Sequence, residues 1–150
     1  MIAKIANKVR QLYQVANAKV FGRGAPVFHI STEQALNNSH TMNFNPSNIL
    51  EGEPSMRDNQ LVSASHDGMQ VGVWECAPGR FRWNFSCDET AHILEGKATV
   101  TVGEQTVQLV PGSLVFFPVG TKSIWHVTET VKKVYFLHQP SPFVKRLMGA

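Results

Sequence analysis

The feature that most constrains the fold is a series of short apolar or alternating segments, which begins near residue 60 and continues almost to the end of the chain. Glycine or proline turns separate them, as at Asp67-Gly68, Pro78-Gly79 and Pro111-Gly112. Short strands with such turns and no intervening helix are typical of a β-sandwich or β-barrel. The segments are Leu61–Ser65, Met69–Cys76, Phe81–Phe85, Ala91–Leu94, Ala98–Val102, Val107–Val110, Leu114–Phe117, Ser123–Val127 and Val134–His138.

The first 24 residues have a different pattern. Apolar residues recur there at three- and four-residue steps, which predicts an amphipathic helix. Residues 1–32 carry five basic residues and no acidic one. This charge is that of a solvated helix face, or of a surface that contacts nucleic acid, a membrane or an acidic partner. Lysine and arginine interrupt any signal-peptide-like apolar stretch, so a cytoplasmic location is expected.

Residues 25–59 lack a strong periodic pattern. Ser31 to Leu36 predicts one helical turn, and the stretch from Asn37 to Asn59 is rich in Asn, Ser, Pro and Gly, which predicts a loop. The expected organisation is therefore a basic helix over residues 1–24, a wrapping segment over 25–59 and an all-β barrel over 60–150.

Two glycine-containing motifs in the barrel region resemble those of the cupins. Gly112 is followed after five residues by Pro118 and then by Gly120, and Glu89 is followed after six residues by Gly96. This spacing is similar to the end of the first cupin motif and the start of the second. The resemblance implies a jelly-roll (RmlC-like) β-barrel and a homodimer. In the dimer, the apolar face of the helix predicted for residues 1–24 is expected to be buried.

A narrower resemblance covers residues 54–139. The strings Gly72-Val73-Trp74-Glu75-Cys76-Ala77-Pro78-Gly79 and Phe117-Pro118-Val119-Gly120 are similar to the cupin branch named after (S)-ureidoglycine aminohydrolase, and also to ethanolamine-utilisation cupins. It implies a small-molecule enzyme that acts on a ureido, amino-acid or sugar-like compound.

The chain departs from the cupin pattern at its metal ligands. The positions where two histidines are expected hold Arg82, Trp83, Asn84 and Phe85, and Ser123 stands at the third. Of the usual ligands only Glu89 remains, and one carboxylate does not hold a transition metal, which takes three or four donors. No cofactor is therefore predicted. The alternative is a transition metal held by relocated ligands, namely Glu89, His92, His126 and His138, although period-2 counting turns His92 and His126 away from the face of Glu89.

The replacements favour a metal-free aromatic pocket. Trp83 and Phe85 take the inward positions, and Trp74 and Trp125 add to the walls. The polar residues expected there are Arg82, Glu89, Ser123, Lys132 and Tyr135. Among aromatics Glu89 is expected to have a raised pKa and to act as a general acid or base. The alternative is that the aromatics fill the core and Glu89 pairs with a lysine or arginine.

Three hypotheses of function follow. The first is a domain that binds a small organic ligand without metal, and the second is a metal-dependent, aminohydrolase-like enzyme. The third is an accessory protein that docks through residues 1–24. The sequence contains no P-loop, nucleophile elbow or HExxH motif, and its barrel region is not basic, which argues against nucleic-acid binding.

Overall fold

The computed structural model describes residues 28–63 and 69–139. The predicted helix over residues 1–24 lies outside them. No helix in the described part of the chain is long and apolar enough to cross a membrane. The elements are α2 (Thr32–Asn37), β1 (His40–Thr41), η1 (Pro46–Asn48), β2 (Ile49–Gly52), β3 (Met56–Ser63), β4 (Met69–Cys76), β5 (Gly79–Asn84), β6 (Asp88–Val102), β7 (Gln105–Leu109), β8 (Leu114–Phe117) and β9 (Lys122–His138).

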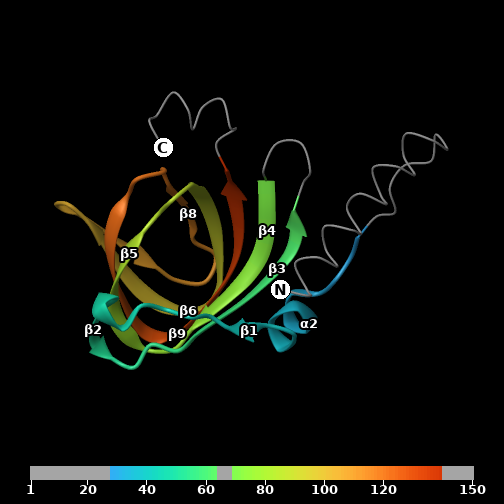
Figure 1. Ribbon diagram of the computed structural model, residues 1–150, viewed down its shortest axis with the longest axis horizontal. Helices are drawn as coiled ribbons and strands as arrows, with labels where there is room; N and C mark the ends of the chain where they lie inside the picture. The colour runs from blue at the N-terminus through green and yellow to red at the C-terminus, as the bar shows by residue number, and fades with distance from the viewer. Residues whose placement is uncertain (1–27, 64–68, 140–150) are drawn as a thin grey trace.

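The strands form one antiparallel sheet that curls into a half-barrel (Figure 1). The two longest strands, β6 and β9, form the centre of the sheet and pair along most of their length. The other edge of β9 pairs first with β5 and then with β4, and the other edge of β6 pairs with β8 and then with β7. The predicted all-β barrel is confirmed.

A bend divides β6 and β9 into two halves. Three register shifts lie between Ile93 and Ala98, and Gly96 has a φ of 84°. A Cβ on Gly96 would lie 2.1 Å from the carbonyl oxygen of Thr130 on β9, so only glycine fits this close approach. The bulged stretch keeps the pairing continuous, which is why the predicted strands over 91–94 and 98–102 form one strand.

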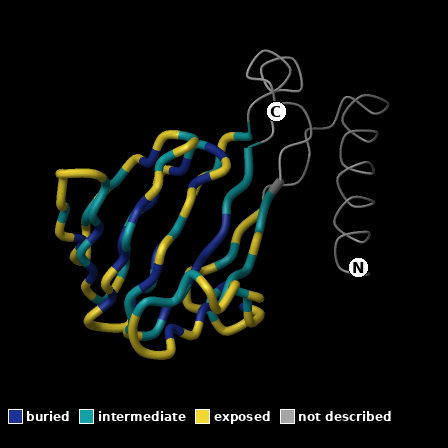
Figure 2. Tube along the Cα trace, turned by 60° about the vertical axis from the view of Figure 1, so that its left-hand side comes forward, coloured by how far each residue is buried: buried dark blue, intermediate teal, exposed yellow. Residues whose placement is uncertain are grey.

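Burial alternates along the strands, as Figure 2 shows by the change of colour along the tube. On β9 the odd-numbered residues from Ser123 to Leu137 face the interior, apart from the exposed bend. On β6 the inward residues are odd-numbered up to Ile93 and even-numbered from Ala98, because the bulge shifts the alternation by one residue.

Helix α2 covers the outer face of β3 and β4. Ser31 is its N-cap, since the Ser31 side chain accepts a hydrogen bond from the Gln34 backbone N–H. The Asn59 side-chain amide donates to the Ala35 carbonyl at 2.8 Å, which ties α2 to β3. Ala35 is fully buried, as is Val73 on β4. The predicted helical turn is confirmed.

The predicted loop from Asn37 to Asn59 is correct only in part, because residues 42–45 and 53–55 are irregular but much of the rest forms strands. Within it, β1 pairs with β3, β2 pairs with β5, and β3 already begins at Met56. These pieces have two to four residues before β3, too short to show a periodic pattern. Sheet pairing with partners distant in sequence, rather than local composition, makes them strands.

Candidate functional site

A cavity of about 170 Å³ opens inside the half-barrel, and its lining comes from inward positions of β3, β4, β5, β6 and β9 together with Met42. The wall is mainly aromatic, with a few polar groups. The lining residues are Met42, Asp58, Gln60, Gln70, Trp74, Phe81, Trp83, Glu89, Trp125, Lys133, Tyr135 and Leu137.

All three tryptophans of the chain line this cavity. The ring centroid of Trp74 lies 5.8 Å from that of Trp125 and 6.4 Å from that of Trp83, both in edge-to-face contacts. Trp83 also stacks in parallel on Phe44 at 5.7 Å. Such contacts fix the ring positions, so the walls of the cavity are rigid.

Glu89 on β6 and Lys133 on β9 form an ion pair at the cavity wall, with side chains only 8% and 7% exposed. Burying two charges is costly and is tolerated only when each finds its partner. The ammonium nitrogen of Lys133 also lies 4.6 Å from the ring centroid of Trp74 and 5.2 Å from that of Trp125. These cation–π contacts fix the charge of Lys133 beside the tryptophans.

A second polar pair, Asp58 on β3 and Tyr135 on β9, joins the same wall through a side-chain hydrogen bond. Burial raises the pKa of Asp58, and the Tyr135 hydrogen bond and the charge of Lys133 only partly oppose this rise. Burial, and then the negative charge of Asp58, raise the pKa of Tyr135, which therefore stays a protonated donor. Asp58 is thus a half-buried acceptor at the cavity.

Gly72 makes room for this arrangement. A Cβ at this position would lie 2.3 Å from the Tyr135 hydroxyl oxygen and 2.7 Å from the Asn59 carbonyl oxygen. The Tyr135 ring therefore packs directly over the backbone of β4, in the space that any side chain at position 72 would fill.

Two polar atoms of the cavity residues lack partners. The indole nitrogens of Trp74 and Trp125 are buried without a hydrogen-bond acceptor among the residues that the structure describes. An unsatisfied buried donor costs about 1–3 kcal/mol of the free energy of unfolding.

Five of the residues predicted for the site meet at this cavity: Trp74, Trp83, Glu89, Trp125 and Tyr135. The hypothesis that Glu89 pairs with a lysine is confirmed, and the lysine is Lys133. Trp83 is half-buried, whereas Trp74 and Trp125 are 5% and 2% exposed. The tryptophans are thus both core and wall.

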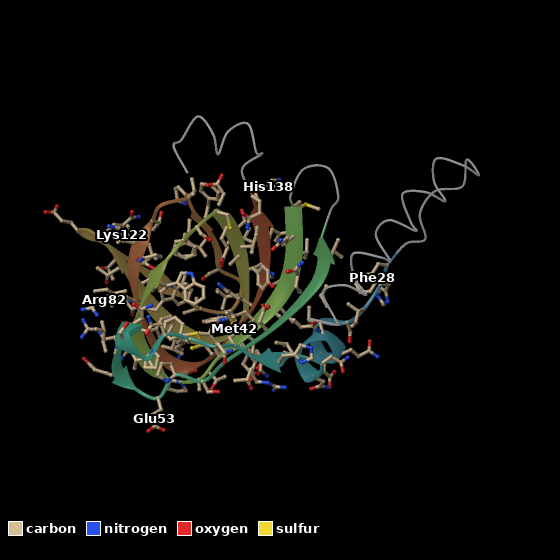
Figure 3. The ribbon with its side chains drawn as sticks, in the orientation of Figure 1. Phe28, Met42, Glu53, Arg82, Lys122 and His138 are labelled. Atoms are coloured by element: carbon tan, nitrogen blue, oxygen red, sulfur yellow. The ribbon has the colours of Figure 1, made fainter. Side chains whose placement is uncertain are left out.

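Four other predicted residues lie elsewhere. Arg82 is exposed and points away from the barrel (Figure 3), because its neighbour Trp83 takes the inward position. Phe85 packs in the core against Phe117 with ring centroids 4.3 Å apart. Ser123 is buried and donates to the Trp83 carbonyl at 2.9 Å. Lys132 faces outward and pairs with Glu95 at 2.8 Å, so Lys133, not Lys132, is the lysine of the cavity.

The residues present do not fit a cupin metal ion. Among the described residues, no group of three His, Cys, Asp or Glu side chains lies close enough to hold one. The proposed substitutes are scattered, because His126 is exposed on the outer face and His138 lies exposed at the end of β9 (Figure 3). His92 alternates with the inward residues Ala91 and Ile93 and is directed away from Glu89. The structure does not bring Glu89, His92, His126 and His138 together.

Residues 64–135 match the family model described as the EutQ-like cupin domain. The curled antiparallel sheet agrees with this match, so the barrel has the fold of a cupin domain. No match was found among the curated proteins.

Solved structures support the same fold. EutQ, the ethanolamine utilization protein Q, of Salmonella typhimurium LT2 is 23% identical, with a TM-score of 0.50 over 56% of this chain and 69% of that one. The EutQ protein of Clostridium difficile is 19% identical, with a TM-score of 0.53 over 67% and 82%. A DUF861-family protein of unknown function from Pseudomonas syringae pv. tomato DC3000 is 22% identical, with a TM-score of 0.61 over 66% and 43%. At these identities the likeness concerns the fold.

Proposed function

We propose that this cupin domain binds a small organic ligand in the cavity between its tryptophans, without a metal ion. The observation that carries the proposal is the cavity itself, which is lined by all three tryptophans of the chain and by a buried ion pair. Small-molecule sites are typically concave and mostly apolar, with a few fixed polar groups.

The polar groups support ligand binding over a purely structural role. Replacing a buried ion pair by apolar residues is often neutral or stabilising, so stability alone does not require Glu89 and Lys133. Asp58 adds a half-buried carboxylate to the same wall. Their concentration at one cavity is typical of a recognition site.

A ligand screen tests this proposal directly. Because every tryptophan lines the cavity, a bound molecule is expected to change the intrinsic fluorescence, and it should raise the melting temperature. Leu137→Phe enlarges a lining side chain and should abolish binding, whereas Leu114→Phe, on the exposed outer face, should leave it intact. Equal binding by both variants and the wild type would place the ligand elsewhere.

The sequence resemblance extends the proposal to a relationship with the (S)-ureidoglycine aminohydrolase-type branch. The metal-dependent hydrolysis of that branch is not part of it, because the donor set of the cavity does not fit a metal. A role of Glu89 as a general acid or base stays a prediction. Its ion pair with Lys133 favours instead a role in compensating the charge of that lysine.

We also propose a homodimer. Leu114 and Phe116 on β8 and Phe136 on β9 are 77%, 58% and 41% exposed. Thr90 of β6 pairs with both Phe116 and Phe136, so the two phenylalanines lie on the same outer face. An apolar surface of this kind supports contact with a second copy of the chain.

A further inference from the structure

We infer that the cavity binds a small organic cation, whose ammonium charge is compensated by the carboxylate of Asp58. This inference rests on the proposed function and names the chemical class of its ligand.

The cavity carries an unbalanced negative charge. Among the described residues that line it, Asp58 and Glu89 are acidic and Lys133 is the one basic residue. Two carboxylates and one ammonium group leave one negative charge when all three are ionised. Because Glu89 and Lys133 form a buried ion pair with each other, the charge that lacks a partner is that of Asp58.

Asp58 is also the carboxylate that a ligand can reach. It is half-buried, whereas Glu89 is buried and held by Lys133. Tyr135 donates a hydrogen bond to Asp58, but no lysine or arginine of the described residues forms an ion pair with it. Lys133 attracts the charge of Asp58 from farther away, and Glu89 opposes that attraction.

A cation beside Asp58 would offset the effect of burial on its charge. Burial raises the pKa of Asp58, because removal from water disfavours the charged form of a carboxyl group. A positive charge nearby favours that same charged form. An anionic ligand would instead add a second uncompensated negative charge to the cavity.

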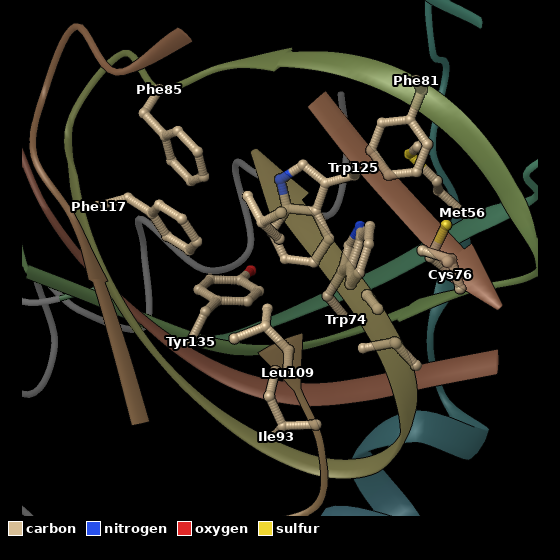
Figure 4. Packing of buried hydrophobic residues seen from close by; sticks show 14 residues of the cluster. Met56, Trp74, Cys76, Phe81, Phe85, Ile93, Leu109, Phe117, Trp125 and Tyr135 are labelled. Atoms are coloured by element: carbon tan, nitrogen blue, oxygen red, sulfur yellow. The ribbon is translucent and has the colours of Figure 1, made fainter. Parts of the chain in front are cut away.

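The aromatic walls suit a cation as well. Figure 4 shows the rings of Trp74, Trp125 and Phe81 gathered inside the barrel from β4, β9 and β5. The faces of such rings attract positive charge, and the ammonium group of Lys133 already lies over Trp74 and Trp125. Trp83 is the half-buried tryptophan of the lining, and neither of these contacts involves it. Its ring is therefore left for a second cation.

The size of the cavity limits the body of the ligand. Its volume of about 170 Å³ is close to that of an engineered cavity of roughly 150 Å³ that holds benzene. A molecule with one ring and a short amine side chain, such as benzylamine, is of this size.

The experiment compares three probes that share one ring and differ in charge. Benzylamine, benzyl alcohol and benzoate are titrated into the full-length protein at about pH 7, by tryptophan fluorescence and by calorimetry. We expect benzylamine, the cation, to bind at least about tenfold more tightly than neutral benzyl alcohol. Benzoate, the anion, should bind more weakly than benzyl alcohol.

Matched variants test the carboxylate. Asp58→Asn removes the charge and keeps both the size of the side chain and an acceptor for Tyr135, so the affinity ratio of benzylamine to benzyl alcohol should fall about tenfold. Glu75→Gln makes the same change of charge on the neighbouring strand β4, where Glu75 pairs with Arg57 outside the cavity, and the ratio should not change. Using the ratio removes the effect of any general change in the cavity wall.

Salt provides a second test that needs no variant. Because Asp58 is only half-buried, dissolved ions partly screen its attraction for a cation. Raising sodium chloride from about 50 to about 500 mM should therefore weaken benzylamine more than benzyl alcohol.

The outcomes separate the two proposals. Binding of benzyl alcohol or benzoate as tightly as benzylamine, or an unchanged ratio in Asp58→Asn, would overturn the cation inference and leave the ligand-binding proposal standing. An equal fall of the ratio in Asp58→Asn and Glu75→Gln would trace the preference to the overall charge of the protein and would overturn the inference as well. Failure of all three probes, together with failure of the wider ligand screen, would overturn both.

Discussion

Glu89 and Lys133 form a buried ion pair that joins β6 to β9, the two longest strands of the sheet. The rings of Trp74 and Trp125 flank its ammonium group. The pair therefore belongs at once to the sheet core and to the cavity wall, and its removal has consequences for both.

Lys133→Met should destabilise the protein strongly. It leaves the Glu89 carboxylate buried without its partner, which costs about 3–5 kcal/mol of the free energy of unfolding. The adjacent Lys132→Met breaks only an exposed pair with Glu95 and should cost less than about 1 kcal/mol. Urea denaturation of the two variants measures the difference.

The double variant Glu89→Leu/Lys133→Met is the control for this interpretation. It removes both charges and should recover most of the lost stability. Equal losses for Lys132→Met and Lys133→Met would contradict the burial of the pair.

Gly72→Ala should destabilise the protein by about 1–3 kcal/mol through overpacking. The new methyl group would overlap the Tyr135 hydroxyl and the carbonyl oxygen of Asn59, and a backbone atom does not move away easily. Gly103→Asn is the control, since nothing lies within 4 Å of its Cβ position and asparagine tolerates its φ of 58°. Thermal unfolding should separate the two variants, and a wild-type melting temperature for Gly72→Ala would speak against the packing of Tyr135 described above.

Asp58 should make stability depend on pH. Burial raises its pKa in the folded protein above the ordinary value of 3.8, so the unfolded chain loses this proton first as the pH rises. The contribution of Asp58 to the free energy of unfolding therefore falls from pH 3.8 upward, until the pH passes the folded-state pKa.

Asp58→Asn removes this dependence and keeps an acceptor for Tyr135. The free energy of unfolding of Asp58→Asn minus that of the wild type should be larger at about pH 7 than at about pH 4. Urea unfolding at the two pH values measures this difference. The other charged groups near Asp58, namely Lys133, Glu89 and His40, are common to both proteins. A stability difference that is the same at both pH values would show that the pKa of Asp58 is not raised.

The purified, untagged protein is expected to contain much less than one equivalent of a transition metal. The described residues do not bring three suitable donors together, and the carboxylate of Glu89 is held by Lys133. Elemental mass spectrometry measures the content, with Glu89→Gln as the control. One equivalent in the wild type that is lost in Glu89→Gln would instead favour a metal enzyme with relocated ligands.

Phe116→Ser should weaken the proposed dimer at least about tenfold, because it places a hydroxyl on the apolar outer face. Phe28→Ser changes a residue that is 45% exposed outside the sheet and should have no effect. Sedimentation at several concentrations provides the measurement. A wild-type protein that remains a monomer at high concentration would contradict the proposed dimer.

Local periodicity predicted most of the barrel and about half of the site. The alternation of strands correctly turned Ser123 and Trp125 inward and His126 outward. The same counting, applied from Tyr135, gives Lys133 as an inward residue and excludes Lys132, and counting from Trp83 excludes Arg82. These errors came from selecting neighbours on opposite faces of one strand.

The remaining site residues carried no local signal. Asp58 and Gln60 lie in a polar stretch that becomes part of β3 only through its pairing with β4. Met42 reaches the cavity from a short connection beside β1. Phe85 and Phe117 are 32 positions apart in the sequence and meet only through the curl of the sheet. The same curl determines which aromatic side chains line the cavity and which fill the core. Such contacts depend on tertiary packing rather than on periodicity.

The bend at Gly96 has a consequence for the local unfolding of the domain. Because β6 and β9 each continue through it, one pair of strands supplies the hydrogen-bond ladder of both halves. The two halves have different outer partners, β5 and β7 for one and β4 and β8 for the other, but the same two central strands. The amide protons of Trp125 and Tyr135, on either side of the bend, should therefore exchange with solvent in a single cooperative event. Ligand bound between the tryptophans would slow the exchange of both protons by the same factor.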